Sequence, residues 1–240
     1  MSFIGQIENY EVGGVCHGLI SKNSSYVFFS GNRFCTLETA KTALLKYTGG
    51  SAINLVFPKQ THSDLTIEAS AGIDYSTQEA DAVWTREVCL AVGVVTADCI
   101  PLLLWHPGLP FCAAIHAGWR GVASRIIPKT LEKIKPLFDP KELEIWIGPH
   151  IKAEDFEVGL DVAGRIAESS DLGESVFSSH EDKQKVRLDL TQVAIAQLRE
   201  FAISKIHVDP RNTMRDNTLS SFRREKAGCG RMIHMIARIK

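Results

Sequence analysis

Three short, almost uninterrupted apolar runs follow one another closely in the middle of the chain. They are Val88–Val95, Ile100–Trp105 and Phe111–Ile115. A strand exposed on one face alternates apolar and polar residues, whereas continuous runs rich in Val, Ile and Leu are typical of strands buried on both faces. The sequence therefore predicts a sheet that is covered on both sides, with residues 52–57 and 143–147 as further strands.

Helical periodicity becomes evident after these runs. Residues 190–201 place their apolar side chains three or four positions apart, with Asp189 or Thr191 available as an N-terminal cap. A second helix is predicted from Val122 to Ile134, and Pro128 inside it predicts a kink or a break there. The two patterns together indicate a mixed α/β class.

The length of the chain is compatible with one large domain. Its 240 residues contain no internal repeat, low-complexity tract or Pro/Ser-rich linker, and residues 232–239 are predicted to form a closing strand. We therefore expect a single domain over residues 1–240.

The charge balance excludes some classes of partner. With 27 basic and 28 acidic residues the formal net charge is -1, which gives no global attraction to nucleic acid or to an anionic membrane. The N-terminus does not resemble a signal peptide, and no stretch approaches the roughly 18 apolar residues of a membrane span. Six scattered cysteines without an export signal indicate free thiols. We expect a cytoplasmic protein, monomeric or weakly self-associating.

Reactive side chains are concentrated where polar segments interrupt the apolar runs. These segments are 59–64, 96–101 and 116–121. The ends of strands are where α/β proteins collect side chains from distant parts of the sequence into one cleft. The three segments are therefore the candidates for a shared site, but their spacing in the sequence is too long to show that they converge.

His62, Cys99 and His116 are the candidate catalytic and metal-ligating residues in these segments. Taken singly, a lone cysteine or histidine is more often structural than functional. Taken together, one thiolate and two imidazoles suit zinc with an open fourth position, or copper. A nucleophilic pair, in which His116 lowers the pKa of Cys99, is the alternative interpretation of the same residues.

Adjacent arginines near the C-terminus form the fourth feature. Arg223 and Arg224 lie just before a Gly-Cys-Gly-Arg segment. Paired arginines most often mark a solvated surface, but the guanidinium fork is also the usual group for recognising phosphate or carboxylate.

Seven short motifs together resemble those of one family, the YfiH/YlmD family, also called the laccase-domain or multicopper polyphenol oxidase family and the purine nucleoside phosphorylase family. They are Gln60-Thr61-His62, Ala80-Asp81-Ala82, Thr96-Ala97-Asp98-Cys99-Ile100-Pro101, His116-Ala117-Gly118-Trp119-Arg120-Gly121, Ile147-Gly148-Pro149, Phe156-Glu157-Val158-Gly159 and Ser221-Phe222-Arg223-Arg224. Their order and spacing match over nearly the whole chain from about residue 50.

The resemblance implies a mixed-sheet sandwich flanked by helices, with a zinc or copper ion held by His62, Cys99 and His116. It implies phosphorolysis of adenosine, inosine and methylthioadenosine, and deamination of adenosine. Nucleoside and phosphate are then the expected partners. The residues expected to bind them are Gln60, Arg120, Arg223, Arg224 and Lys22.

The chain departs from the family pattern near the expected substrate site. Lys22 stands where the family usually has an arginine, which replaces a fork with a point charge. Ser63 replaces a glycine, and residues 150–156 and 209–213 lack cysteines that are usual there. The ligand set is retained, so the departures concern the substrate pocket.

Three other functions are compatible with the same residues. The first is a cysteine or zinc hydrolase acting on an amide of a muramyl–amino-acid precursor, as some members are linked to peptidoglycan editing. The second is a non-enzymatic module stabilised by a metal. The third, copper-dependent polyphenol oxidation, is disfavoured because it needs more converging histidines than three.

Overall fold

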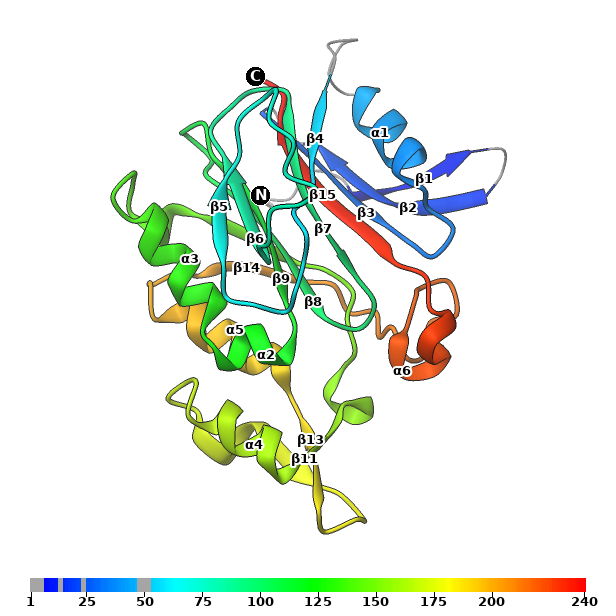
Figure 1. Ribbon diagram of the computed structural model, residues 1–240, viewed down its shortest axis with the longest axis vertical. Coiled ribbons are helices and arrows are strands. Elements are labelled where there is room, and N and C mark those ends of the chain that lie inside the picture. The colour runs from blue at the N-terminus through cyan, green and yellow to red at the C-terminus, as the bar shows by residue number, and fades with distance from the viewer. Residues whose placement is uncertain (1–6, 13–14, 23–24, 47–52) are drawn as a thin grey trace.

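The computed structural model describes residues 7–12, 15–22, 25–46 and 53–240, and two six-stranded mixed sheets form its centre (Figure 1). The first sheet has the order β1 (Ile7–Val12), β2 (Val15–Lys22), β3 (Tyr26–Gly31), β15 (Met232–Arg238), β7 (Leu90–Thr96) and β4 (Asn54–Val56). The second has the order β14 (Lys205–Val208), β10 (Glu144–Ile147), β8 (Ile100–Trp105), β9 (Cys112–Ala117), β6 (Ala82–Thr85) and β5 (Thr66–Glu68).

Burial on both faces of the central strands explains their continuous apolar sequences. In β8, Leu102 and Leu104 belong to one core, whereas Leu103 and Trp105 point the other way and pack between the two sheets. Successive side chains of a strand point to opposite faces, so a strand enclosed on both sides has no position for a polar residue. The predicted strands of residues 100–105, 111–115 and the others named above are confirmed to within a few residues.

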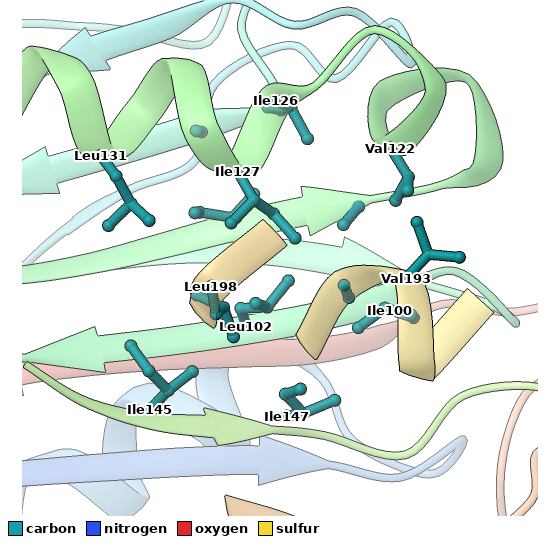
Figure 2. Close-up of a cluster of buried hydrophobic side chains, with 14 of the residues drawn as sticks. Ile100, Leu102, Val122, Ile126, Ile127, Leu131, Ile145, Ile147, Val193 and Leu198 are labelled. Atoms are coloured by element: carbon teal, nitrogen blue, oxygen red, sulfur yellow. The ribbon is translucent and has the colours of Figure 1, made fainter. Parts of the chain in front are cut away.

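Helices cover the outer faces of this sandwich. The first sheet packs against α1 (Leu37–Leu45), whose N-terminus is capped by the Thr36 side chain. The second sheet packs against α2 (Trp119–Ala123), α3 (Ile126–Ile134) and α5 (Leu190–Arg199). Figure 2 shows Ile127 and Leu131 of α3 and Leu198 of α5 among the side chains of this core. The expected mixed-sheet sandwich flanked by helices is confirmed.

The helix predicted over residues 122–134 is broken, but not at the proline. Arg125, with a φ of 63°, separates α2 from α3. Pro128 lies in the first turn of α3, where a backbone N–H has no partner within the helix, so the missing donor costs nothing. At the predicted helix over 190–201, Asp189 caps α5 by accepting the N–H of Gln192.

A third, smaller sheet lies beside the sandwich and was not predicted. It has the order β11 (Glu157–Gly159), β13 (Lys185–Leu188) and β12 (Phe177–Ser179), and α4 (Leu160–Ala167) follows its first strand. Val158 and Leu188 join the core that α3 and α5 also enclose. The remaining short elements are α6 (Phe222–Glu225) and the 3-10 turns η1 (Pro140–Glu142), η2 (Ala153–Asp155), η3 (Gly173–Val176) and η4 (Lys226–Gly228).

Two expectations drawn from composition can be compared with the described residues. None of their helices has the length and apolarity that crossing a bilayer requires. The five cysteines whose side chains are described, Cys35, Cys89, Cys99, Cys112 and Cys229, are free thiols, as predicted.

Candidate metal centre and adjoining cavity

The three candidate ligands come from separate segments that meet at one end of the sandwich. His116 is near the end of β9, Cys99 directly precedes β8, and His62 lies in the loop after β4. In Figure 1, β9 leads directly into α2. The connection into β8 lies at the same end of the second sheet as α2 does. The three polar segments therefore converge in the structure, which their spacing in the sequence could not show.

The donor atoms of His62, Cys99 and His116 lie within 4.8 Å of one another. The Sγ of Cys99 is 3.9 Å from the Nε2 of His62, and the two imidazole rings meet nearly edge to face at 79°. A tetrahedral zinc ion with bonds of about 2.0–2.3 Å separates its ligands by roughly 3.3–3.8 Å. Two imidazoles and a thiol that already face one point fit such an ion after a small contraction.

Gly118 makes this approach sterically possible. A Cβ on Gly118 would lie 2.9 Å from the Sγ of Cys99 and 3.1 Å from the Cδ2 of His62. Both distances are shorter than ordinary van der Waals contact, so any larger residue would displace the ligands. Gly118, two residues after His116, thus contributes to the site because it has no side chain.

Asp81 orients two of the three ligands, although it is fully buried. Its carboxylate accepts a hydrogen bond from the Nδ1 of His116 at 2.7 Å, which leaves the Nε2 of His116 for the site. It also accepts the backbone N–H groups of Thr61, His62 and Ser63 and the hydroxyl of Ser63. A carboxylate behind a ligating histidine fixes its tautomer and ring orientation. Asp81 therefore fixes both His116 and the loop that carries His62.

Asp98 holds the bend that presents Cys99. It has a φ of 82°, a left-handed conformation that aspartate tolerates better than most residues. Its carboxylate accepts the hydroxyl of Thr213 at 2.5 Å and the backbone N–H of Arg223 at 2.6 Å. Both carboxylate oxygens of Asp98 are therefore hydrogen-bonded at this bend.

The environment favours a thiolate at Cys99. Burial by itself raises the pKa of a thiol, but hydrogen bonds with His116 and His62 outweigh it and lower the pKa of Cys99 to about 6. Burial likewise opposes protonation of His116, and hydrogen bonds with Asp81 and Cys99 raise the pKa of its imidazole to about 9. Cys112, buried without such partners, has its pKa raised to about 12 by burial. The pKa values of Cys99 and Cys112 therefore differ because Cys99 has two histidine partners, whereas burial raises the pKa of both thiols.

A cavity of about 640 Å³ adjoins the three ligands. This is within the range of about 300–1,000 Å³ that is usual for small-molecule sites. Its walls combine apolar side chains with a few charged ones: Gln60, His62, Val95, Thr96, Ala97, Asp98, Cys99, His116, Trp119, Arg120, Ile151, Phe156, Glu157, Val158, Val162, Leu190, Phe222, Arg223 and Arg231.

The residues predicted to bind substrate are placed in different surroundings. Arg120 and Arg223 line the cavity. Gln60 lines it as well, but its side-chain amide is occupied by the N–H and C=O of Val95 at 2.7 and 2.8 Å. The side chain of Lys22, in β2, is outside the described part of the structure.

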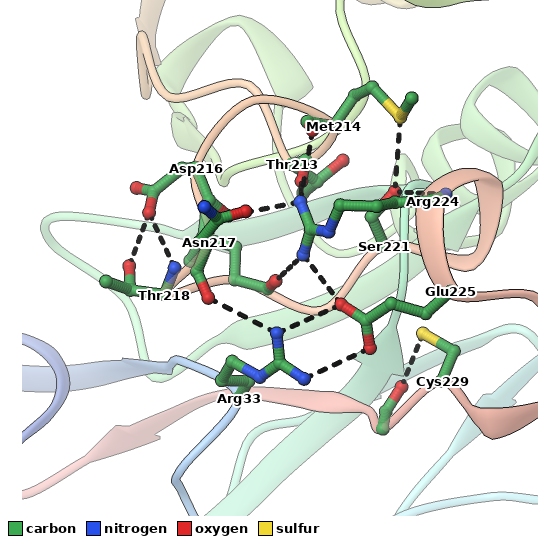
Figure 3. Close-up of polar contacts among 12 residues, drawn as sticks. Arg33, Thr213, Met214, Asp216, Asn217, Thr218, Ser221, Arg224, Glu225 and Cys229 are labelled. Atoms are coloured by element: carbon green, nitrogen blue, oxygen red, sulfur yellow. Dashed lines mark hydrogen bonds and ion pairs between the residues drawn. The ribbon is translucent and has the colours of Figure 1, made fainter.

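Arg224, next to Arg223 in sequence, is not among the described residues that line the cavity. Its guanidinium donates to the carbonyls of residues 213, 214, 216 and 219 and to the carboxylate of Glu225 (Figure 3). Glu225 in turn binds Arg33 through both of its oxygens. In this arrangement Arg224 organises the loop before α6.

Two important residues of the site were not singled out from the sequence. Asp81 was noted only within an Ala-Asp-Ala motif, and a charged residue between two small apolar ones is itself a signal of a partnered, buried carboxylate. Arg231 was seen only as part of a glycine-rich turn, although it lines the cavity.

Residues 22–239 match the family described as multi-copper polyphenol oxidoreductase laccase. A purine nucleoside phosphorylase of Clostridium acetobutylicum is 32% identical over 182 residues, covering 74% of each chain. The purine nucleoside phosphorylase YfiH of Escherichia coli is 30% identical over 182 residues, covering 75% of this chain and 72% of that protein. The crystal structure of YlmD from Geobacillus stearothermophilus has a TM-score of 0.80 at 19% identity, covering 96% of this chain and 98% of that one. This last likeness establishes the fold.

Proposed function

The chain belongs to the multi-copper polyphenol oxidoreductase laccase family, which confirms its resemblance to the YfiH/YlmD proteins, and we propose that it is a metal-dependent purine nucleoside enzyme. The reactions are phosphorolysis of adenosine, inosine and methylthioadenosine, and deamination of adenosine. The observation that carries the proposal is the convergence of His62, Cys99 and His116 at the wall of a cavity of about 640 Å³. The names of two relatives support the substrate class.

The ion is Zn²⁺ or Cu²⁺, held by the thiolate of Cys99 and one nitrogen of each histidine. When bound it supplies a Lewis acid beside the cavity. Asp81 keeps the Nδ1 of His116 occupied, so that the Nε2 is the nitrogen offered to the site. Gly118 leaves the space in which Cys99 and His62 approach each other.

The other residues of the cavity wall offer apolar and cationic groups that suit a nucleoside and phosphate. Val158, Leu190 and Phe222 provide apolar wall for a flat base, and Arg120 and Arg223 provide cationic groups for phosphate. In phosphorolysis the bond between ribose C1′ and the purine nitrogen breaks and a bond from C1′ to a phosphate oxygen forms. In deamination a water oxygen bonds to C6 and ammonia leaves. Both reactions need the base and the ribose to be held in one orientation, and we assign this role to the cavity walls.

A second candidate function rests on the order in which Cys99, His116 and Asp81 lie. The Sγ of Cys99 lies within 4.8 Å of a ring nitrogen of His116, and His116 is hydrogen-bonded to Asp81 at 2.7 Å, which is the order of groups in a nucleophilic triad. This arrangement favours a hydrolase that forms an acyl-enzyme at Cys99, acting on the amide of a muramyl–amino-acid precursor. Alkylation separates the two: a nucleophilic Cys99 reacts rapidly in the metal-free protein and forms an acyl adduct with substrate, whereas a ligand forms no adduct.

Copper-dependent polyphenol oxidation by several clustered ions has less support. Among the described residues, one group of three side chains could hold an ion. A multicopper mechanism requires many more ligands close together than that group supplies.

The test is metal analysis of the purified protein together with mass-spectrometric analysis of products. Adenosine, inosine and methylthioadenosine are supplied with and without phosphate, and the muramyl–amino-acid precursor is supplied separately. We expect phosphate-dependent release of the base, and loss of both metal and activity in Cys99→Ala. Full activity of Cys99→Ala would refute the proposal.

A further inference from the structure

The two segments that depart from the family pattern, residues 150–156 and 209–213, lie against each other in the structure. A β-bridge joins His150 to Asn212, and the Oδ1 of Asn212 accepts the backbone N–H of Lys152 at 3.4 Å. The half-buried side chain of Lys152 donates from its Nζ to the backbone carbonyl of Asp209 at 2.8 Å. The two unusual segments therefore hold one lysine amine in a fixed place.

The imidazole of His150 is the second group in contact with this amine. His150 is fully buried, and its Nδ1 lies 2.7 Å from the carbonyl of Gly148. A carbonyl can only accept, so Nδ1 carries the ring proton and Nε2 is left with a lone pair. The Nζ of Lys152 lies 3.2 Å from Nε2 and 3.5 Å from Nδ1, so it contacts the ring and not a single nitrogen. Burial, followed by the charge of Lys152, lowers the pKa of His150 to about 4, and the imidazole beside the amine is therefore uncharged at neutral pH.

The carboxylates that act on the charge of Lys152 are engaged by other donors. They are Asp209, which binds Arg211 at 2.6 Å; Asp189, which accepts the backbone N–H of Gln192; and Glu154, which accepts the side-chain amide of Asn212 at 2.9 Å. Within the described ranges no ion pair includes Lys152. A half-buried ammonium at this position would therefore have no counter-ion in contact with it.

These surroundings favour the uncharged form of the amine. Burial is the main cause that lowers the pKa of Lys152 to about 8, and the three carboxylates offset it only in part. The hydroxyl of Thr191, in the first turn of α5, lies 2.7 Å from the Nε2 of His150, so the amine is also close to the positive end of that helix. At pH 8 about half of the Lys152 side chains are uncharged, whereas less than about 1% of exposed lysines are. The uncharged amine is the form that acts as a nucleophile.

We propose that Lys152 is a modification site of this protein, at which its uncharged amine reacts with an activated acyl donor, a thioester or an acyl phosphate. The Nζ forms a bond to the acyl carbon, and the bond from that carbon to sulfur or to the phosphate oxygen breaks. The leaving group departs with the electron pair of that bond, and the amine gives up one proton to the solvent. Lys152 is not among the described residues that line the cavity, so this reaction is separate from the function proposed above.

The product of acylation fits the surroundings of Lys152. An amide removes the charge that has no counter-ion, and it keeps one N–H for the carbonyl of Asp209. An aldehyde would instead form an imine, which keeps this hydrogen bond only if it also keeps the positive charge. Acyl donors therefore suit this position better than aldehydes do.

Acetylation kinetics resolved by residue test the site. The whole protein is treated with S-acetyl-N-acetylcysteamine or with acetyl phosphate between about pH 6.5 and about pH 9.5, on both sides of the pKa of Lys152. Acetylation of each lysine is measured by mass spectrometry after digestion with a protease that does not cleave at lysine. The internal controls are Lys183, which is exposed, and Lys205, which is half-buried but forms an ion pair with Glu144 at 3.3 Å. The same reactions in guanidinium chloride give the rate of each lysine in the unfolded chain.

We expect Lys152 of the folded protein to be acetylated at least about fivefold faster than Lys183 and Lys205 at pH 8, since far more of its amine is uncharged. Its rate should level off above about pH 8, whereas the rates of the two control lysines should continue to rise toward pH 9.5. In guanidinium chloride the three rates should agree within about twofold. Preferential reaction of Lys152 with only one of the two reagents identifies the class of donor. A Lys152 that reacts no faster than the control lysines with either reagent overturns the site.

Discussion

The carboxylate of Asp98 accepts the backbone N–H of Arg223 at 2.6 Å, although the two residues are 125 positions apart in the chain. Cys99 follows Asp98 directly, and Arg223 lines the adjoining cavity. One side chain therefore joins the thiol of the candidate metal centre to an arginine of the cavity. The second oxygen of Asp98 accepts the hydroxyl of Thr213, which ties the loop before α6 to the same point.

Asp98→Ala should impair both ends of the cavity. It removes two acceptors and places alanine at a φ of 82°, a left-handed conformation that aspartate and asparagine tolerate better than alanine does. We expect the free energy of unfolding to fall by about 2–4 kcal/mol and turnover to fall more than about tenfold. Asp98→Asn is the matched variant, because asparagine tolerates this backbone, its amide oxygen can still accept the N–H of Arg223, and its N–H₂ group can donate to the hydroxyl of Thr213, which can turn to accept. Denaturant unfolding and turnover should show a much smaller effect for Asp98→Asn, and equal losses would contradict this role.

Gly118→Ala should remove the metal without unfolding the protein. The added Cβ would lie 2.9 Å from the Sγ of Cys99, which forces the thiol away from His62. We expect metal content to fall at least about tenfold with an unchanged circular-dichroism spectrum, because a shift of about 1 Å disrupts ligand geometry. Gly164→Ala is the control: it lies in α4 with open space around it, and should be neutral or stabilise by about 1 kcal/mol. Normal metal content in Gly118→Ala would refute the steric argument.

Much of the sandwich was predictable because its signals are local. The apolar sequences of β7, β8 and β9 are continuous because both faces of these strands are enclosed. A continuous apolar run is therefore enough to predict a strand of this kind. The third sheet was not predictable in the same way. Its strands are three or four residues long and partly exposed. They are too short to show a hydrophobic pattern in the sequence, and their strand conformation depends on hydrogen bonds to the neighbouring strands.

The site was predictable only in part, for a different reason. His62, Cys99 and His116 stood out through the motifs around them, but composition and spacing alone did not bring them together. Arg223 and Arg224 are indistinguishable in sequence, and their surroundings differ because the 213–219 loop folds over one of them and not the other. Such a difference depends on tertiary contacts that no local pattern records.

Asp81→Asn should weaken metal binding by about 10–100-fold, the usual effect of removing the group behind a ligating histidine. The amide nitrogen of asparagine would face N–H donors that the carboxylate now accepts, including those of Thr61 and Ser63. The free energy of unfolding should therefore also fall, by about 1–3 kcal/mol. Asp64→Asn is the control in the same loop, because Asp64 forms an exposed ion pair with Lys129 that contributes about 1 kcal/mol or less. Metal titration and urea unfolding measure both quantities, and equal metal affinity in the two variants would contradict the role of Asp81.

His234 should make the fold sensitive to acid. It is fully buried in β15, between the hydroxyls of Ser30 at 3.0 Å and Thr96 at 2.9 Å. Burial is the main cause that lowers its pKa from 6.5 to about 3. In the unfolded chain this imidazole takes up a proton below about pH 6.5, whereas in the folded protein it stays neutral down to about pH 3. The unfolded state therefore binds more protons in this window, so the contribution to stability is complete above pH 6.5 and is lost as the pH falls toward 3.

At pH 5 the loss from His234 amounts to about 2 kcal/mol relative to pH 7.5, since each pKa unit corresponds to about 1.4 kcal/mol. His234→Gln removes the titrating group while an amide can still bond to both hydroxyls. Urea unfolding at the two pH values should show that the variant loses about 2 kcal/mol less on acidification than the wild type does. His207→Gln, at a half-buried position in β14, is expected to keep the wild-type loss. The same pH dependence in His234→Gln and the wild type would mean that other groups cause the acid sensitivity.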